Sequence, residues 1–277
     1  MKRTLGLIGS RGYVGQELVR LLEAHGELDV RVREDATERL DAYILALPNG
    51  VTKQFVDQMG DSVVIDLSAD HRFDDAWVYG QPERNRARIR GAKRISNPGC
   101  YATAMQLALA PLVPYLDGPA HVFGVSGYSG AGKKPSPKND PEVLRDNLLP
   151  YSLVDHVHER EVARQLGVPI FFAPHVAPFF RGITVTVSCA LGKDIPDALY
   201  EDTYASEAGV HVTKDAPLVR DVAGKHDVFI GGVTKGDKRV TVVATIDNLL
   251  GGAASQALRN LNLALGFPER QGLDAAS

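Results

Sequence analysis

The first sixteen residues contain a strand, a glycine-rich loop and the start of a helix in immediate succession, and this order constrains the fold more than any other feature. Leu5–Gly9 is typical of a short buried strand, further glycines follow at Gly12 and Gly15, and an apolar helical repeat begins at Gln16. These are the first parts of a βαβ unit, which requires a parallel sheet. Such a loop lets the backbone approach a pyrophosphate at the positive end of a helix. The pattern predicts an N-terminal nucleotide-binding sheet.

Further apolar runs continue this pattern at residues 28–32, 42–47 and 63–67. Because they alternate with helical segments, they are typical of a parallel sheet covered on both faces. The last two runs end in polar loops at residues 48–50 and 68–70. Ligands of open α/β sheets bind outside the carboxyl ends of the strands, so we expect both loops to face the same crevice as the glycine loop.

Basic residues near the glycine loop favour NADP over NAD. A 2′-phosphate is met by a cation near the second strand, whereas an acidic residue there selects NAD. Arg11, Arg31 and Arg33 supply cations, and Glu34 and Asp35 are competing carboxylates. We therefore expect NADP(H), with an ordinary surface role for the arginines as the alternative.

One of the two cysteines, Cys100, stands at the start of a predicted helix. Pro98 and Gly99 make the preceding turn irregular, and helix-forming residues run from Tyr101 to a break at Pro111. Unpaired N–H groups at a helix N-terminus favour the thiolate and can bring a thiol pKa down from its usual ~8.5. The position favours a nucleophile over a small packed hydrophobic residue.

Overall charge and cysteine content exclude several classes of protein. The 277 residues carry a net charge of −3, which gives no reason to expect nucleic-acid or membrane partners. Two cysteines are too few for a disulfide framework, and the N-terminus does not resemble a signal peptide, so a cytoplasmic location is expected. No metal-ligand spacing is present, and no metal is expected.

The second half of the chain has a different character. A glycine-rich loop at residues 126–135 precedes alternating strands at 183–188 and 239–244, which predicts an α+β domain. An amphipathic helix is predicted at residues 253–267, returning to the first domain, and the tail 272–277 is predicted to be disordered.

A thiol beside a nicotinamide site suggests acyl transfer followed by hydride reduction, which also requires a base and anion binders. His156 and His158 precede a helical segment, and His175 is a third candidate by residue type. Arg181 and the pair Lys133 and Lys134 could bind phosphate or carboxylate, although exposed cations are common.

Several segments together resemble the N-acetyl-gamma-glutamyl-phosphate reductases of arginine biosynthesis. The longest match runs from Ile95 through Cys100 to Ala104 and continues at residues 108–111. Similar segments cover nearly the whole chain, at residues 9–15, 46–50, 66–70, 78–83, 126–132, 174–175, 181–182 and 246–250.

This resemblance implies an α/β fold. A Rossmann-type parallel-sheet domain would span residues 1–124 and be completed by the C-terminal helix 249–270. An α+β domain similar to that of glyceraldehyde-3-phosphate dehydrogenase would span residues 125–248 and supply catalysis, substrate binding and oligomerisation. A homo-oligomer, dimer or tetramer, is expected.

The resemblance also implies an activity and a set of site residues. The activity is NADPH-dependent reductive dephosphorylation of N-acetyl-gamma-glutamyl phosphate to N-acetylglutamate 5-semialdehyde through a thioester on Cys100. His156 and His158 match a His-x-His motif that supplies the acid/base, and His158 is favoured because it adjoins the helix start. Substrate-binding positions are Asn97, Ser126 and Arg181. The positions implied for the cofactor are Gly9, Ser10, Arg11, Gly12, Tyr13, Val14, Gly15, Leu47, Pro48, Ser68, Gly130 and Asn248.

The chain also departs from the family pattern. It is shorter between His25 and Asp41 and between Arg72 and Tyr79, and Val157 and Gly251 stand where the family has cations. The alternatives are therefore a related acyl-phosphate reductase, acting on aspartyl, N-succinylglutamyl or aminoadipyl phosphate, and a non-catalytic NADP-sensing protein.

Overall fold

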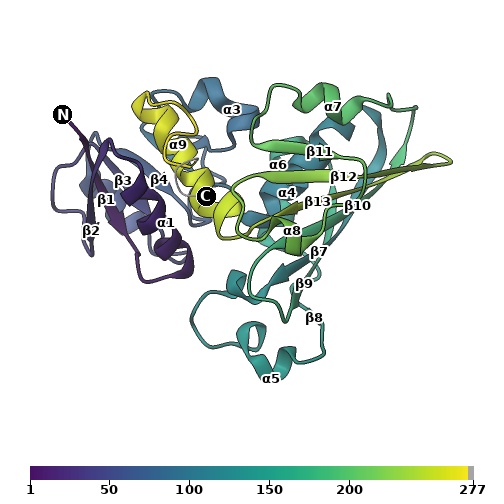
Figure 1. The fold of residues 1–277 in the computed structure, drawn as a ribbon, viewed down its shortest axis with the longest axis horizontal. Helices are drawn as coiled ribbons and strands as arrows, with labels where there is room; N and C mark the ends of the chain where they lie inside the picture. The colour runs from purple at the N-terminus through teal and green to yellow at the C-terminus, as the bar shows by residue number, and fades with distance from the viewer. Residues whose placement is uncertain (274–277) are drawn as a thin grey trace. The chain divides into compact units, whose positions relative to one another are not determined.

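The structure is a computed structural model that describes residues 1–273 and divides into two compact units (Figure 1). The first unit contains Met1–Gly99 and the C-terminal segment from Gly252, and the second contains Cys100–Gly251. Most of the tail predicted to be disordered, residues 274–277, lies outside the described residues. In its described part, Leu273 is fully buried and its N–H donates to the Arg270 carbonyl.

The first unit is built on a six-stranded sheet in the order β2-β1-β3-β4-β6-β5, with every neighbouring pair parallel. The predicted parallel sheet is confirmed, and β5 and β6 are additional strands. The strands are β1 (Arg3–Ile8), β2 (Leu28–Arg33), β3 (Ala42–Leu45), β4 (Val63–Asp66), β5 (Val78–Tyr79) and β6 (Arg94–Ser96). The helices are α1 (Tyr13–Ala24), α2 (Lys53–Val56), α3 (Pro82–Ile89) and α9 (Ser255–Leu265).

The strand order creates a switch point between β1 and β3. From β1 the chain moves outward to β2 and then returns to β3 on the other side of β1. The connections that leave the carboxyl ends of β1 and β3 therefore diverge, and dinucleotides bind at such a point in doubly wound sheets.

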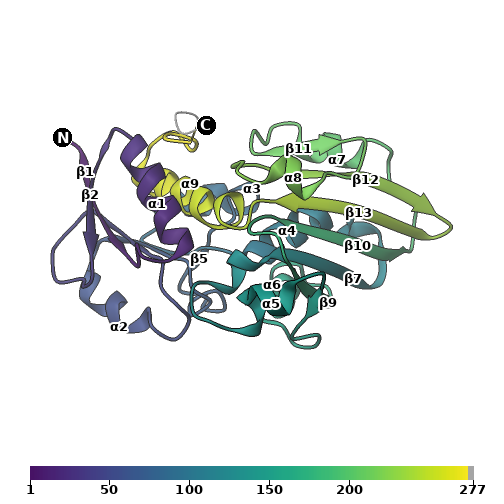
Figure 2. The same ribbon diagram turned by 60° about the horizontal axis from the view of Figure 1, so that its bottom comes forward.

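The C-terminal helix α9 belongs to the first unit, where it packs on α1, α3 and β4. Figure 2 shows α9 beside α1. The predicted amphipathic pattern is incomplete, because residues 255–263 are buried on all sides. Its polar residues are buried with partners: Asn260 Nδ2 donates to the Gly80 carbonyl, and Asn262 Oδ1 meets His25 Nε2. Arg259 forms ion pairs with two glutamates.

The second unit contains a seven-stranded mixed sheet in the order β11-β12-β13-β10-β7-β9-β8. The two predicted alternating segments form the antiparallel pair β10 and β13, with Ile183 opposite Ile246 and Ala190 opposite Arg239. The strands are β7 (Leu116–Gly127), β8 (Leu149–Pro150), β9 (Ile170–Ala177), β10 (Ile183–Leu191), β11 (Val210–Thr213), β12 (Val228–Gly236) and β13 (Arg239–Ile246). The helices are α4 (Cys100–Leu109), α5 (Pro141–Leu144), α6 (Val157–Leu166), α7 (Leu199–Tyr204) and α8 (Val219–Val222).

Helices α4 and α6 pack against each other and cover one face of this sheet, α4 on β10 and β13 and α6 on β9 (Figure 1). All residues of α4 from Tyr101 to Leu109 are buried. The units divide at Gly99 rather than near residue 124, because β7 pairs with β10 and β9 in the second sheet and α4 belongs to its core.

Candidate active site

The residues expected to act together are distributed over both units. The first unit contains Gly9, Ser10, Arg11, Gly12, Tyr13, Val14, Gly15, Leu47, Pro48, Ser68 and Asn97. The second contains Cys100, Ser126, Gly130, His156, His158, Arg181 and Asn248.

The glycine loop between β1 and α1 is closely packed against backbone. Gly9 has φ +96°, and a Cβ there would lie 2.2 Å from the Ala46 carbonyl oxygen. A Cβ on Gly15 would lie 2.2 Å from the Gly9 oxygen. Both positions therefore require glycine, and the loop offers main-chain atoms at the start of α1 without side chains in the way. This is the cradle that a pyrophosphate needs.

The loops after β3 and β4 are held together by buried hydrogen bonds. Asp66, fully buried at the end of β4, accepts from the backbone and hydroxyl of Ser68 and from Thr52 Oγ1. Its Oδ2 also lies 2.7 Å from His71 Nδ1. Asp70 accepts from Gly50 N–H in the neighbouring loop. The expected juxtaposition of these two loops is confirmed.

Each arginine expected to favour NADP lies near a carboxylate. Arg11 pairs with Glu34 at 3.3 Å, and both side chains are highly exposed. Glu38 pairs with both Arg31 and Arg33 at the end of β2. Glu38 thus holds two cations beside each other.

Asn97 is buried where the first unit ends. Its N–H donates to the Asp66 carbonyl, and its Oδ1 accepts from Asn260 Nδ2 at 2.9 Å. Its own carbonyl accepts from Arg72 Nε. These bonds fix the backbone three residues before Cys100.

Cys100 is the first residue of α4, as the sequence predicts, and is partly buried against the core. The next residue, Tyr101, anchors this helix end because its hydroxyl donates to the His175 carbonyl at 2.9 Å and bonds to Ser126. Burial raises the pKa of Tyr101 well above its usual value, and the Cys100 thiolate raises it further.

Tyr151 lies in the same surroundings. Burial raises the pKa of its phenol, the Cys100 thiolate raises it further, and a hydrogen bond with Tyr101 lowers it. Two phenols therefore accompany the thiol, both neutral at physiological pH.

The two histidines have different surroundings. His156 is the N-cap of α6, and its Nδ1 accepts from the His158 N–H at 3.1 Å. Burial, together with the nearby cations Lys138 and Arg160, lowers the pKa of His156 to about 4. His158 lies within the first turn of α6, with its ring centroid 6.1 Å from that of Tyr101 and 4.9 Å from that of His156. The third candidate, His175, meets Tyr101 only through its carbonyl.

A second cluster brings together Ser126, Gly130, Arg181 and Asn248. Asn248 Oδ1 accepts from the Gly182 N–H at 2.7 Å, and its Nδ2 donates to Ser129 Oγ at 2.9 Å. A Cβ on Gly130 would contact Ser126 Oγ and Asn248 Nδ2. Because Ser126 also bonds to Tyr101, this cluster is continuous with the end of α4.

Sequence reasoning missed Tyr101, Tyr151 and Asp247 as parts of the site. Tyr101 adjoins Cys100, but only the folded chain brings its hydroxyl to β7 and β9. Asp247 is fully buried beside Arg181, and its place in the family-like segment 246–250 was the signal that could have pointed to it.

Residues 1–273 contain no group of three His, Cys, Asp or Glu side chains placed to hold a metal ion. In the same residues, no helix has the length and apolar character needed to cross a membrane.

Family models match both units. A model described as semialdehyde dehydrogenase, NAD binding domain, matches residues 27–92, and one described as semialdehyde dehydrogenase, dimerisation domain, matches residues 100–248. An N-acetyl-gamma-glutamyl-phosphate reductase of Xanthomonas euvesicatoria pv. vesicatoria is 51% identical over 307 aligned positions, covering 97% of each chain. The chain belongs to the N-acetyl-gamma-glutamyl-phosphate reductase family. The resemblance inferred from the sequence is confirmed.

Other comparisons agree with this membership. An N-acetyl-gamma-glutamyl-phosphate reductase of Stenotrophomonas maltophilia is 50% identical and covers 96% of each chain. Aspartate semialdehyde dehydrogenase II of Vibrio cholerae has the same fold, with a TM-score of 0.81, 18% identity, and coverage of 96% of this chain and 99% of that one. The expected fold class is confirmed.

The departures from the family pattern have physical counterparts. The alignment of 307 positions exceeds the 277 residues of this chain, so the Xanthomonas reductase contains residues that this member lacks. At Gly251 a Cβ would lie 2.8 Å from the His226 carbonyl oxygen. The backbone here leaves no room for the lysine expected in the N-acetyl-gamma-glutamyl-phosphate reductase pattern.

Proposed function

We propose that this protein reduces N-acetyl-gamma-glutamyl phosphate to N-acetylglutamate 5-semialdehyde, with release of phosphate and use of NADPH. One observation carries the proposal: a relative of that name is 51% identical across 97% of both chains. Such a reaction needs a nucleophile and an acid/base. The thiol at the start of α4 would supply the first, and His158, whose ring lies near that of Tyr101, would supply the second.

Cys100 is the nucleophile in this proposal. Its thiolate attacks the acyl carbon, and backbone N–H groups at the start of α4 stabilise the oxyanion. The carbon–oxygen bond to phosphate then breaks, which leaves a thioester on Cys100. His158 carries the proton from the Cys100 thiol to the departing phosphate oxygen. After hydride reduction of the thioester, the carbon–sulfur bond breaks, the aldehyde leaves with Cys100 as a thiolate, and a proton from solvent restores the thiol for the next turnover.

His158 rather than His156 is the proposed acid/base. His156 uses Nδ1 to cap α6, and its pKa of about 4 keeps it neutral near pH 7. The use of Nδ1 in the cap and the lowered pKa both disfavour His156 as a proton carrier, which supports the proposal of His158.

The glycine cradle fits a dinucleotide because Gly9 and Gly15 leave no Cβ between the backbone and a phosphate. Residues 9–15, Leu47, Pro48 and Ser68 would hold it, and the family resemblance also assigns Gly130 and Asn248 to the cofactor. When bound, NADPH supplies the hydride that reduces the thioester. Arg11, Arg31 and Arg33 would meet its 2′-phosphate, and Ser126, Arg181 and Asn97 would bind the acyl phosphate.

The test is phosphate-dependent reduction of NADP by N-acetylglutamate 5-semialdehyde, with N-succinylglutamate and aspartate semialdehydes in parallel. Turnover with the N-acetyl compound and at least tenfold less with the others is expected. Cys100→Ser should abolish turnover while leaving NADPH affinity within twofold. Activity on none of the compounds would refute the proposed function, and substantial activity in Cys100→Ser would refute covalent catalysis.

Thiol labelling supplies an internal control. Burial raises the pKa of Cys189, in the middle of β10, to about 11, so iodoacetamide should not modify it at pH 7. Wild-type protein should therefore take up one label, and Cys100→Ser none. Slow labelling of Cys100 would favour the non-catalytic NADP-sensing alternative.

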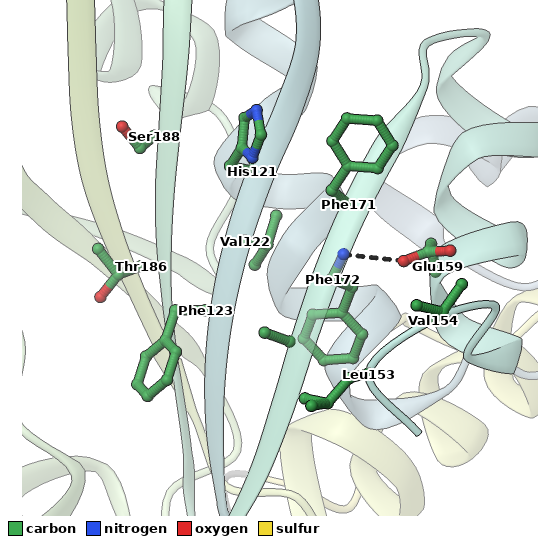
Figure 3. A pocket seen from close by; sticks show the side chains of 11 residues that line it. His121, Val122, Phe123, Leu153, Val154, Glu159, Phe171, Phe172, Thr186 and Ser188 are labelled. Atoms are coloured by element: carbon green, nitrogen blue, oxygen red, sulfur yellow. Dashed lines mark hydrogen bonds between the residues drawn. The ribbon is translucent and has the colours of Figure 1, made fainter. Parts of the chain in front are cut away.

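We also propose that the chain self-associates through the open face of the seven-stranded sheet. The family model matched to residues 100–248 is described as a dimerisation domain. Away from α4 and α6, this sheet carries exposed Phe123 and Phe171, and Leu153 and Val154 line the same pocket of about 460 Å³ (Figure 3). Phe171→Glu should reduce the mass measured by light scattering, and an unchanged mass would refute this interface.

We also propose that the protein is located in the cytoplasm.

A further inference from the structure

The corner that ends β13 holds a fully buried carboxylate that the proposed mechanism does not use. Asp247 Oδ1 accepts from the backbone N–H groups of Leu249 and Leu250, at 2.8 and 3.1 Å. Its Oδ2 accepts from the Gly224 N–H at 2.6 Å and forms an ion pair with Arg181 Nε at 2.8 Å. This one carboxylate therefore joins three segments that are distant in sequence.

The ion pair holds the Arg181 guanidinium close to Asp247. The Asp247 carboxylate is fully buried, whereas the Arg181 side chain is 24% exposed. This charge pairing restrains where the planar guanidinium lies, so its terminal nitrogens are presented from a restricted position. Burial of both charges is favourable only while they stay paired, which opposes rotation of the arginine away from Asp247.

The backbone of Arg181 is fixed independently. Gly182 donates its N–H to Asn248 Oδ1, and its carbonyl accepts from the Gly127 N–H at 2.9 Å. Gly182 has φ +106°, and a Cβ there would lie 2.4 Å from Val219 Cγ1. Consecutive residues of one corner thus hold the two ends of this arginine: Asn248 holds the main chain and Asp247 holds the side chain.

We propose that Asp247 is a positioning residue that orients Arg181 toward a carboxylate of the substrate, the anionic group that the acyl phosphate, the semialdehyde and N-acetylglutamate all carry. The proposal rests on the proposed function, in which Arg181 binds the acyl phosphate. Asp247 touches neither the substrate nor the thiol and acts through the direction of the guanidinium. Its contribution must therefore depend on the presence of Arg181.

A double-mutant cycle tests this dependence. Asp247→Asn keeps the shape but removes the charge, and we expect the KM for the semialdehyde to rise about tenfold while kcat falls less than threefold. Arg181→Ala should raise KM at least as much. Adding Asp247→Asn to Arg181→Ala should raise KM less than twofold further. Independent, multiplicative effects would overturn the proposal.

A matched control separates positioning from loss of stability. Glu83→Gln removes the charge of another buried carboxylate paired with an arginine, Arg259, in the first unit. It should lower the melting temperature but leave the semialdehyde KM within twofold. If Asp247→Asn is too unstable to assay, Asp247→Glu keeps the charge but displaces it, and a wild-type KM in that variant would overturn the proposal.

Binding without turnover gives an independent readout. The affinity for N-acetylglutamate, measured by calorimetry, should be about tenfold lower in Asp247→Asn than in the wild-type protein. In the Arg181→Ala background, the same substitution should change this affinity less than twofold. If the wild-type protein turned over none of the semialdehydes, the proposed function would fail, and this binding comparison would still decide the role of Asp247. Equal losses of affinity in both backgrounds would refute it.

Discussion

Replacing Arg259 by methionine should destabilise the first unit far more than an ordinary substitution. Arg259 Nη1 lies 2.7 Å from Glu83 Oε1, and these side chains are 8% and 2% exposed. Its other edge meets Glu269, which also pairs with Arg86 at 2.6 Å. Methionine would leave Glu83 buried without its cation, whereas Glu269 would keep Arg86.

The magnitude follows from the one carboxylate that loses its partner. Removing one member of a buried ion pair costs about 3–5 kcal/mol, because the remaining charge is uncompensated. For chains of this size, 1 kcal/mol lowers the melting temperature by roughly 2–4 °C, so a fall of about 6–20 °C is expected.

The single tryptophan makes this measurement specific. Trp77 is buried in the first unit and stacks on His71 with ring centroids 4.0 Å apart. Its fluorescence during urea unfolding should show an earlier transition in Arg259→Met. Adding Glu83→Gln should recover part of the loss, because a neutral amide costs less to bury than a carboxylate. A Trp77 transition that shifts by less than about 1 kcal/mol would refute the reasoning.

Two further substitutions test local geometry and charge. Gly9→Ala should lower the free energy of unfolding in urea by at least about 2 kcal/mol, because a Cβ at φ +96° meets the Ala46 carbonyl. The control Gly12→Ala should change it by less than about 1 kcal/mol, because a Cβ there would meet only the Gly9 oxygen, at 3.8 Å. Equal effects of the two substitutions would contradict the close-packing argument. His156 has a folded pKa of about 4, below its unfolded value of ~6.5. Its neutral ring therefore contributes fully to the free energy of unfolding above pH 6.5, and this contribution is lost as the pH falls toward 4. The loss is about 3 kcal/mol at most. His156→Asn should retain the helix cap and lack this part of the pH dependence in urea titrations at pH 7 and 4.5, and an unchanged pH dependence would contradict the assignment.

Regular elements of the fold could be predicted because their sequence patterns are long. The apolar runs at β1, β3 and β4, and the alternation in β10 and β13, each extend over at least four residues. β5 has two residues and β6 has three, too few for any periodicity to emerge. The predicted boundary between the units, near residue 124, lies beyond the observed one at Gly99, because the apolar run of β7 has no feature that assigns it to the second sheet.

The candidate site could be predicted only where residue type carries the chemistry. The residue types of Cys100 and the two histidines indicate reactivity in the sequence itself. The glycines of the loop likewise indicate backbone freedom. Tyr101 and Asp247 could not be predicted in this way, because only the fold brings a carbonyl of β9 to the first and Arg181 to the second. Helix α9 shows the same limit, since Arg259 and Asn260 look like a solvent face until Glu83 and Gly80 supply their partners.

The two histidines show how backbone position can support a proposed chemical role that residue type leaves open. They are two residues apart and alike in sequence context, yet one precedes α6 and the other lies in its first turn. The cap consumes Nδ1 of His156, and burial together with Lys138 and Arg160 disfavours its charged form. A ring held neutral in this way stabilises the helix start but is poorly suited to carry a proton near pH 7. By fixing the start of α6, His156 also fixes His158, whose ring lies near that of Tyr101, the residue that anchors the end of the helix that begins with Cys100.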